Sequence, residues 1–267
     1  MFAEQLIGWI FGACLGASLG SFANVLALRW HEEASVFGRS ACPRCKRQLK
    51  PQHLVPIVSW LWLRGHCATC GKKIHVQYPL VELAGFILGL IAAYRHDPFS
   101  IFAGPQFWFE LIFSCALLVP LVMDIRWKEI PVEFLGSLSL VAGVLNVLGF
   151  GLVEGMGIQA RLVSIMLGTI TAGLFFSVQV LLSKGRWLGI GDIWLGVFMG
   201  AVLGWPLLPI SIYLAYLLGG SVAIIGLLLG RLKRGDRLPF APALSAGMVM
   251  AIWIGPKMYE WILAAWR

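Results

Sequence analysis

Leu188-Gly-Ile-Gly-Asp-Ile-Trp-Leu195 opens an apolar run that continues to about residue 210. A carboxylate at the edge of such a run is costly in a bilayer, so Asp192 is a candidate functional residue that needs a partner. Gly189 and Gly191 have no side chains and would let the backbone of an extended peptide approach Asp192 closely. The alternative is an ordinary helix start softened by glycine, with Asp192 as its N-cap. In both cases the run predicts a membrane helix.

The composition extends this prediction to the whole chain. Of the 267 residues, 59% are hydrophobic and 13% are charged, and the mean hydropathy is +0.82. Soluble proteins carry about 25% charged residues, so we expect an all-α polytopic membrane protein with about eight transmembrane helices. The apolar spans lie at about 6–28, 79–95, 107–124, 132–150, 160–183, 191–210, 212–230 and 243–264. If the break at 206–209 were only a kink, the count would be seven and the C-terminus would change sides.

We predict three parts in this chain. Residues 1–29 form the first transmembrane span, residues 30–78 form a small cytoplasmic loop domain, and residues 79–267 form a core of seven spans. The first span is not expected to be a cleaved signal peptide, because Glu4 stands where a basic region would be and no cleavage site of small residues follows.

The distribution of Lys and Arg predicts the topology. Segments 29–78, 125–131, 184–190 and 231–241 hold 17 of the 21 basic residues. By the positive-inside rule these segments are cytoplasmic and both termini are periplasmic. The 17 residues are Arg29, Arg39, Arg44, Lys46, Arg47, Lys50, Arg64, Lys72, Lys73, Arg126, Lys128, Lys184, Arg186, Arg231, Lys233, Arg234 and Arg237. The opposite side carries Arg95, Arg161, Lys257 and Arg267. Topology and anionic membrane lipids therefore explain the net charge of +8, and we expect no nucleic-acid partner.

This topology gives Asp192 a partner. Asp124 ends the third apolar span on the cytoplasmic side, at the depth where Asp192 begins the sixth. Two carboxylates at one depth can share a proton and activate a water molecule. We predict that Asp124 and Asp192 form a catalytic pair.

The loop domain contains two CxxC pairs, Cys42-Pro-Arg-Cys45 and Cys67-Ala-Thr-Cys70, separated by 21 residues. Each pair can present two thiolates to one tetrahedral ion, and persistent disulfides are disfavoured on the cytoplasmic side. We predict a structural Zn²⁺ bound by Cys42, Cys45, Cys67 and Cys70, with no position left open for substrate. A redox-active dithiol pair is the alternative. The nearby histidines are expected to remain free: His53, His66 and His75.

The first span carries a stripe of glycines, at Gly8, Gly12, Gly16 and Gly20. Small residues four apart allow close helix packing, so we expect another helix to lie against this stripe. Apart from this spacing we expect no internal repeat.

Two further acidic residues lie near span ends. Glu82 follows Tyr78-Pro79 at the cytoplasmic start of the second span, where it is either a favourable first-turn acidic residue or part of a site. Glu110 begins the third span from the opposite side and is expected at the interface.

Several stretches together resemble the type IV prepilin peptidases, and they cover nearly the whole chain in order. They are Gly20-Ser-Phe22, Asn24-Val25, Arg29, the two CxxC pairs, residues 56–61 and 63–65, Tyr78 to Glu82, Asp124 with Ile130-Pro131, Gly189 to Asp192, and Leu238 to Pro242. The GxGD motif alone is also found in presenilin-type proteases, whereas its combination with the cysteine loop is specific.

The resemblance implies a membrane aspartic peptidase that cleaves a short basic leader from type IV prepilin or type II secretion pseudopilin precursors. It implies that Asp124 and Asp192 are catalytic and that the four cysteines are metal ligands. Members with the cysteine loop usually also methylate the new N-terminal amine, with S-adenosyl-L-methionine as donor. Tyr78 and Glu82 then belong to a possible methyltransfer site.

Three positions depart from the family pattern. Trp194 stands where many members have a lysine, so the positive charge near the aspartates would have to come from elsewhere, with Arg126 and Arg186 as candidates. Val132 replaces an asparagine, and Ala241 replaces a glycine. These changes leave both catalytic carboxylates in place.

Two other functions fit the same features. A proton-coupled transporter would use the two aspartates as a relay, although the repeated halves common in transporters are not visible. A non-enzymatic assembly factor would bind its partners through the zinc loop.

Overall fold

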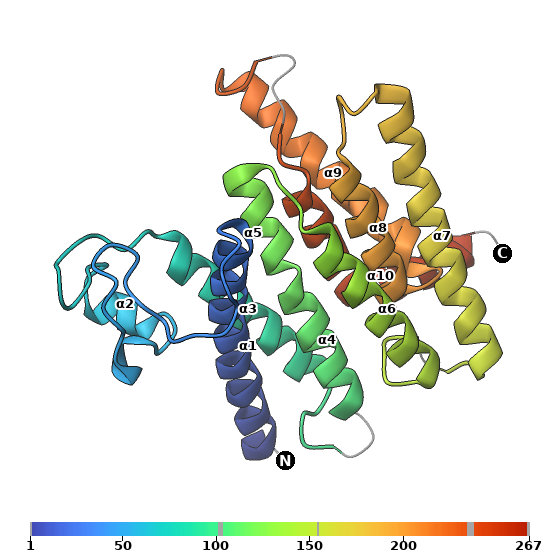
Figure 1. The fold of residues 1–267 in the computed structure, drawn as a ribbon. Coiled ribbons are helices and arrows are strands. Elements are labelled where there is room, and N and C mark those ends of the chain that lie inside the picture. The colour runs from blue at the N-terminus through green and yellow to red at the C-terminus, as the bar shows by residue number, and fades with distance from the viewer. Residues whose placement is uncertain (1, 101–103, 154, 234–237, 266–267) are drawn as a thin grey trace. The chain divides into compact units, whose positions relative to one another are not determined.

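The computed structural model describes residues 2–100, 104–153, 155–233 and 238–265 (Figure 1). Arg234, Arg237 and Arg267, which entered the topology prediction, lie outside these residues. Within the described ranges every regular element is a helix, as predicted. The chain divides into two compact units, residues 1–122 and 123–267. The predicted division at residues 29 and 78 stays a prediction.

The first unit contains a helical group and the loop that carries the cysteines. Its elements are α1 (Phe2–His31), the short 3₁₀ helix η1 (Pro51–His53), α2 (Val58–Trp62), α3 (Gln77–Arg95) and α4 (Gly104–Ala116). The helix α5 (Leu118–Trp127) contains the boundary between the units. The second unit continues with α6 (Val132–Leu148), α7 (Ile158–Ser183), α8 (Ile190–Leu203), α9 (Leu207–Leu228) and α10 (Ala241–Ala265).

Five segments of the described chain are long and apolar enough to cross a bilayer: Glu4–His31, Gln77–Arg95, Gly104–Trp127, Ile158–Ser183 and Leu207–Leu228. They match five of the predicted spans. The fourth and sixth spans correspond to the shorter apolar helices α6 and α8, and the eighth corresponds to α10. The polytopic class is therefore confirmed, and the count of eight stays a prediction.

The third predicted span is not one continuous helix. It divides into α4 and α5, and Leu117 lies between them. Pro120 has no backbone N–H, so it cannot donate to the Ala116 carbonyl as an uninterrupted α-helix would require. The chain restarts its helix immediately before this proline.

Close packing of α1 against α3 confirms the role predicted for the glycine stripe. A Cβ atom added at Gly16 would collide with the Gly85 carbonyl oxygen, and one added at Gly20 would lie 2.6 Å from the Val81 oxygen. The backbones of the two helices therefore touch, because neither presents a side chain between them. On α3, the glycine stripe of α1 packs against two further glycines, Gly85 and Gly89.

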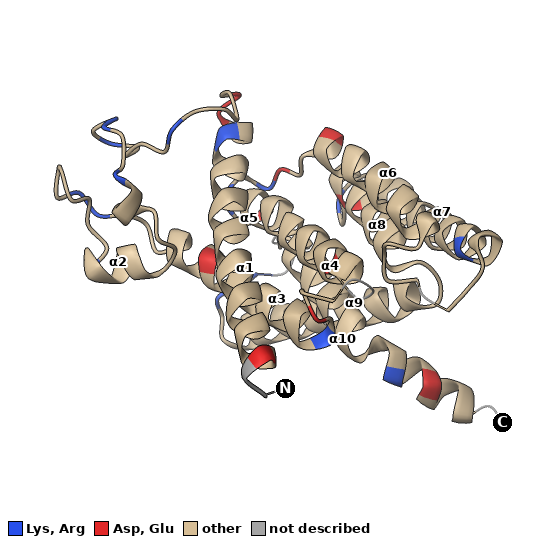
Figure 2. Ribbon diagram, turned by 90° about the horizontal axis from the view of Figure 1, so that it is seen from below, with Lys and Arg blue, Asp and Glu red and all other residues tan. Residues whose placement is uncertain are grey.

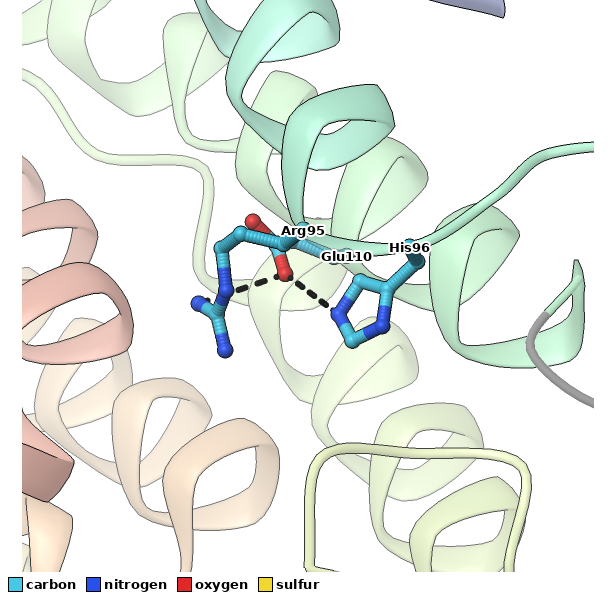
Figure 3. Close-up of polar contacts among 3 residues, drawn as sticks. All are labelled: Arg95, His96 and Glu110. Carbon is cyan, nitrogen blue, oxygen red and sulfur yellow. Dashed lines mark hydrogen bonds and ion pairs between the residues drawn. The ribbon is translucent and has the colours of Figure 1, made fainter. Parts of the chain in front are cut away.

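A buried acidic residue links α3 to α4 in this unit. The Oε2 atom of Glu110 lies 3.4 Å from Nη1 of Arg95 and 3.0 Å from Nε2 of His96 (Figure 3). Glu110 is thus buried in the protein and paired, whereas the sequence suggested only a place near the membrane interface. Two basic partners offset the cost of removing its carboxylate from water.

In the second unit α8 ends earlier than predicted, at Leu203 rather than near residue 210. Gly204 follows with a φ of +61°, a conformation that glycine adopts readily, and Pro206 prevents the helix from continuing. The side chain of Asn146 donates from Nδ2 to the Ala201 and Val202 carbonyls at 3.1 and 2.8 Å. A side chain of α6 thus satisfies carbonyls that the end of a helix leaves without partners.

Charged residues are sparse along the helices and gather at helix ends and in loops, including the loop that carries α2 (Figure 2). Such a distribution is expected of helices that cross a bilayer.

Candidate functional site

Asp192 lies in the first turn of α8 and is only 7% exposed. Its Oδ2 atom accepts a hydrogen bond of 2.8 Å from the backbone N–H of Gly189, the N-cap residue. Asp192 is therefore not the N-cap, as the alternative had it, but the third residue of the helix, whose carboxylate caps back to the N-cap N–H and is held in a defined orientation.

The two glycines of this turn have different surroundings. A Cβ atom at Gly191 would collide with the Ile130 side chain, so the missing side chain makes room within the protein itself. A Cβ at Gly189 would meet nothing closer than 3.8 Å. Only Gly189 therefore leaves open space for an approaching chain.

Asp124 lies near the end of α5 and is also 7% exposed. Its Oδ2 atom accepts a hydrogen bond of 2.9 Å from the backbone N–H of Ala241, the first residue of α10. A segment 117 residues away in sequence thus orients this carboxylate. Each aspartate is held through one of its two carboxylate oxygens.

Both aspartates line one cavity of about 280 Å³ in the second unit. Its other lining residues are Lys128, Ile130, residues 185–191, Leu238, Pro239 and Phe240. Because the two carboxylates line one cavity, a negative charge on either disfavours ionisation of the other. The sequence motifs predicted this pairing, and the structure places the two carboxylates together.

Residues 238–242 resemble a family motif, but no role for them was predicted from the sequence. In the structure they supply a wall of the cavity and the N–H donor for Asp124. Phe240 packs edge-to-face on Tyr216 of α9, with ring centroids 5.0 Å apart. The two prolines that flank Phe240-Ala241 could have indicated this role in the sequence, because prolines restrict the backbone at the start of a helix.

Basic residues line the cavity, although position 194 is a tryptophan instead of the lysine common in the family. Lys128 and Arg186 line the cavity, and the Lys128 charge acts on Asp124. The guanidinium of Arg126 instead lies over the Trp127 ring, 5.0 Å from its centroid. Of the two predicted substitutes for the missing lysine, Arg186 is in place, Arg126 is not, and Lys128 was missed.

Trp194 does not line this cavity. Its ring would lie 3.3 Å from a Cβ atom added at Gly136 of α6. The large indole is accommodated at that position because residue 136 is a glycine.

The four predicted metal ligands come together in the first unit. One Sγ atom from each of Cys42, Cys45, Cys67 and Cys70 lies within 4.8 Å of every other, and those of Cys42 and Cys70 are 4.0 Å apart. Ligands about 2.3 Å from a tetrahedral Zn²⁺ would be about 3.8 Å from one another, so this cluster fits the ion. Within the described ranges none of the six cysteines is in a disulfide.

Backbone donors prepare one of these thiols for metal binding. Hydrogen bonds from the backbone of Cys70 and Thr69 lower the pKa of Cys67 to about 6. The thiolate is the form that binds zinc, so these donors favour the ligand state of Cys67. Burial and the neighbouring thiols instead raise the pKa of Cys70 to about 11.

The two CxxC segments have one backbone structure, which corrects the expectation of no further repeat. In the first, the N–H of Lys46 donates to the Cys42 oxygen, and Ala41 pairs with Gln48 in an antiparallel bridge. In the second, the N–H of Gly71 donates to the Cys67 oxygen, and His66 pairs with Lys73. The signal was present in the sequence as two CxxC segments, each followed by basic residues. It was missed because only the cysteines are identical.

Glu82 and Tyr78, the residues of the possible methyltransfer site, lie one turn apart on α3. Glu82 is buried, and its two oxygens accept hydrogen bonds from Ser21 Oγ at 2.8 Å and from the backbone N–H of Ile57 at 2.7 Å. Glu82 therefore ties α1 and the zinc loop to α3.

The residue that Glu82 holds has an unusual backbone. Ile57 has φ +63° and ψ −53°, and the N–H of Val58 donates to the Pro56 oxygen at 2.6 Å. These features describe a classic γ-turn, which is strained for a β-branched residue. A buried carboxylate thus fixes a strained turn at the start of α2.

One buried donor in this region has no acceptor. Asn24 is 1% exposed, and its Oδ1 atom accepts a hydrogen bond from Gln77 Nε2 at 2.6 Å. Its Nδ2 group has no hydrogen-bond partner in the described part of the chain. Unpaired buried donors are rare, so this atom marks Asn24 as a candidate functional residue.

Comparisons with known proteins identify the family. Residues 14–96 match the model of the bacterial peptidase A24 N-terminal domain, and residues 111–224 match the type IV leader peptidase family. The prepilin leader peptidase/N-methyltransferase of Bacillus subtilis (strain 168) is 31% identical over 260 residues, which cover 93% of this chain and 95% of the relative. The protein of the same name from Pectobacterium carotovorum subsp. carotovorum is 30% identical over 275 residues, with 94% and 95% coverage. That from Pseudomonas aeruginosa is 31% identical over 264 residues, with 90% and 88% coverage. No solved structure matches. The chain belongs to the type IV leader peptidase family.

Proposed function

We propose that this protein is a membrane aspartic endopeptidase that removes the leader from prepilin or pseudopilin precursors and then methylates the new N-terminal amine. The observation that carries the peptidase activity is the cavity in which Asp124 and Asp192 lie together. Membership of the family and the relatives named above support the choice of substrate.

In this proposal one aspartate is ionised and the other is protonated, because two carboxylates in one cavity cannot both ionise cheaply. The ionised group takes a proton from a water molecule as the water oxygen attacks the scissile carbonyl carbon. The protonated group donates to the developing oxyanion, which gives a neutral tetrahedral diol. The group that took the water proton then gives it to the amine nitrogen as the C–N bond breaks, and the other group regains its proton from a hydroxyl of the diol. The backbone donors Gly189 and Ala241 hold the two carboxylates in position for these transfers.

The substrate would enter with its apolar helix in the bilayer and its leader on the cytoplasmic side. Gly189 leaves room for an extended chain beside Asp192. Lys128 and Arg186 bring positive charge to the cavity and favour an ionised carboxylate there.

We assign methyl transfer to the first unit. S-adenosyl-L-methionine would supply an electrophilic methyl group for the new amine. The unpaired Asn24 Nδ2 fits a ligand rich in acceptors, and Tyr78 lies next to Gln77, the hydrogen-bond partner of Asn24. Glu82 has both oxygens engaged within the protein, so we assign it a positioning role in this site.

A Zn²⁺ ion held by the four cysteines would be structural, because four protein ligands complete its tetrahedral coordination. The loop is short and lacks a large apolar core, so a bound metal would stabilise its fold.

The family and the apolar helices place the protein in the bacterial cytoplasmic (inner) membrane. We further propose periplasmic termini, a cytoplasmic active site and contact with anionic lipids, from the distribution of Lys and Arg.

Coexpression with a prepilin tests the peptidase. We expect the precursor to be shortened by the wild-type protein and to remain intact with Asp124→Asn or Asp192→Asn. Asp97→Asn is a matched control, because Asp97 lies outside the cavity and Asn can still accept the hydrogen bond from the Phe99 N–H. Intact precursor with the wild-type protein would contradict the proposal and leave the transporter and assembly-factor alternatives. Full cleavage by either Asn variant would remove that aspartate from the mechanism.

Mass spectrometry of the mature N-terminus tests methylation. With the donor supplied, we expect the mass of one added methyl group. An unmodified amine would contradict the second activity without affecting the first.

A further inference from the structure

An exposed apolar strip runs along the segment that contains α2. Three of its residues lie on one face of α2, and two lie in the loop just before it: Val58, Leu61 and Trp62, and Leu54 and Val55. The side chains of Val58, Leu61 and Trp62 are 58%, 61% and 73% exposed. We call these five residues the α2 strip. Large apolar side chains grouped on a polar loop indicate an interaction surface.

The orientation of the α2 strip is built into the fold. The indole N–H of Trp60 donates to the Ile74 oxygen at 3.4 Å, and its ring would lie 2.9 Å from a Cβ atom added at Gly65. The backbone of Ile57 is held by Glu82. Because Trp60 and Ile57 face the protein, Leu61 and Trp62 face outward.

The surroundings of the α2 strip are positively charged. Between residues 34 and 78 the sequence has eight Lys and Arg residues and no Asp or Glu. Lys50 precedes the segment and Arg64 follows it, and Lys73 pairs with His66 next to Arg64. These three basic residues are exposed, and Lys and Arg are spread over the loop that carries α2 (Figure 2). Exposed Glu32 and Glu33 lie at the start of the loop, before this basic stretch. An apolar strip in a predominantly basic loop is complementary to a layer of anionic lipid headgroups above hydrocarbon.

The lipid surface is also adjacent within the first unit. The loop begins at the end of α1 and returns at the start of α3, and both helices are long and apolar enough to cross a bilayer. Leu80 near the start of α3 and Phe22, nine residues before the end of α1, expose apolar side chains, as expected of residues that face lipid. Tryptophan is favoured at membrane interfaces, where its ring can be buried and its N–H hydrated.

We propose that the α2 strip is an interfacial anchor, which inserts Leu61 and Trp62 into an anionic bilayer surface while the basic residues contact the headgroups. The anchor holds the zinc loop against the membrane at the level where α1 and α3 emerge. It does not depend on the peptidase chemistry, so the two proposals can fail separately.

Photocrosslinking identifies the occupant of the α2 strip. The variant Trp62→p-benzoylphenylalanine is made in the full-length, zinc-loaded protein and placed in nanodiscs of phosphatidylcholine with or without phosphatidylglycerol. The control is Thr69→p-benzoylphenylalanine, since Thr69 is exposed on a CxxC segment outside the strip. We expect lipid adducts at position 62 several-fold above those at position 69, and more of them with phosphatidylglycerol. Lys73→Gln should lower the phosphatidylglycerol-dependent adduct by up to roughly fivefold, because a basic residue near an anionic surface contributes about that factor.

Two outcomes would overturn the anchor. One is a lipid adduct at position 62 no greater than that at position 69. The other is crosslinking mainly to a second protein chain, which would make the α2 strip a protein-binding surface. Equal zinc content in the two variants shows that the loop is folded in both, so that a negative result counts against the proposal.

Discussion

Asp124 is joined to Ala241 by a hydrogen bond of 2.9 Å from the Ala241 backbone N–H to Oδ2 of the aspartate. The donor is the first residue of α10, so the carboxylate also lies at the positive end of that helix. The same relationship occurs within α8, where Gly189 donates to Asp192. Both carboxylates of the proposed pair are therefore oriented by backbone N–H groups at helix starts.

Removal of the Ala241 donor should impair cleavage. Ala241→Pro eliminates the N–H at a helix position that tolerates proline. A hydrogen bond to a charged group contributes about 1.5–3 kcal/mol, so we expect kcat for prepilin cleavage to fall roughly 10- to 100-fold with a smaller change in KM. The matched control is Ala241→Gly, which keeps the N–H and restores the glycine common in the family. Equal kcat values for the two variants would contradict the orienting role.

The cysteine cluster should bind one zinc ion. In the double variant Cys45→Ser/Cys70→Ser, metal analysis should show a fall from about one zinc per chain to almost none, because two of four ligands are lost. Cys14→Ser is the control, since Cys14 lies on α1 outside the cluster. Zinc loss should reduce methylation more than cleavage, because Asp124 and Asp192 lie in the second unit. The idea fails if the double variant retains its zinc.

Glu82 should act by position rather than by charge. In Glu82→Gln the amide oxygen can accept from the Ile57 N–H while the amide nitrogen donates to Ser21 Oγ, so both contacts survive. In Glu82→Ala both are lost, and the N–H of a strained residue is left without an acceptor. We expect methylation to be retained in Glu82→Gln and to fall about tenfold or more in Glu82→Ala.

Hydrogen exchange provides the second measurement for Glu82. Exchange at residues 54–63 should increase in Glu82→Ala and stay near the wild-type rate in Glu82→Gln. Glu133→Ala, at an exposed site on α6, should change neither property. Equal loss of methylation in Gln and Ala variants would instead indicate that the charge of Glu82 takes part in the chemistry.

The buried Glu110 should stabilise the first unit. Glu110→Gln leaves the Arg95 guanidinium without its carboxylate, so we expect the free energy of unfolding in detergent to fall by about 2 kcal/mol, less than for a wholly buried pair. Glu133→Gln is the exposed control and should change stability much less. An unchanged unfolding transition for Glu110→Gln would show that the pair in Figure 3 contributes little.

Much of the molecule was predictable from residue order because the signals are local. Apolar runs about 20 residues long indicate membrane helices wherever they occur, and two CxxC pairs indicate a metal site whatever surrounds them. Close packing at the glycine stripe of α1 was predictable for the same reason, since residues four apart share a helix face. Its partners, Gly85 and Gly89, became known only from the packing of α3.

Local helix breaks were predicted less well. The restart before Pro120 and the end of α8 at Leu203 depend on single residues within apolar stretches. A hydropathy pattern does not detect such breaks, because one Pro or Gly hardly alters the mean hydropathy of the stretch. Backbone hydrogen bonding and backbone conformation decide where these helices end or restart.

The sequence by itself predicted the helical membrane class, the pairing of the two aspartates and the clustering of the four cysteines. Each of these predictions depends on residue type and on the spacing of residues along the chain. Tertiary structure alone decided that residues 238–240 line the aspartate cavity and that Ala241 donates to Asp124. It also decided that Lys128 brings charge to the cavity and that Glu82 secures the zinc loop. These contacts join segments far apart in the chain, and helix packing rather than local pattern brings such segments together. The exposed face of α2 was also decided by tertiary structure, because it depends on the packing of Trp60 toward the protein.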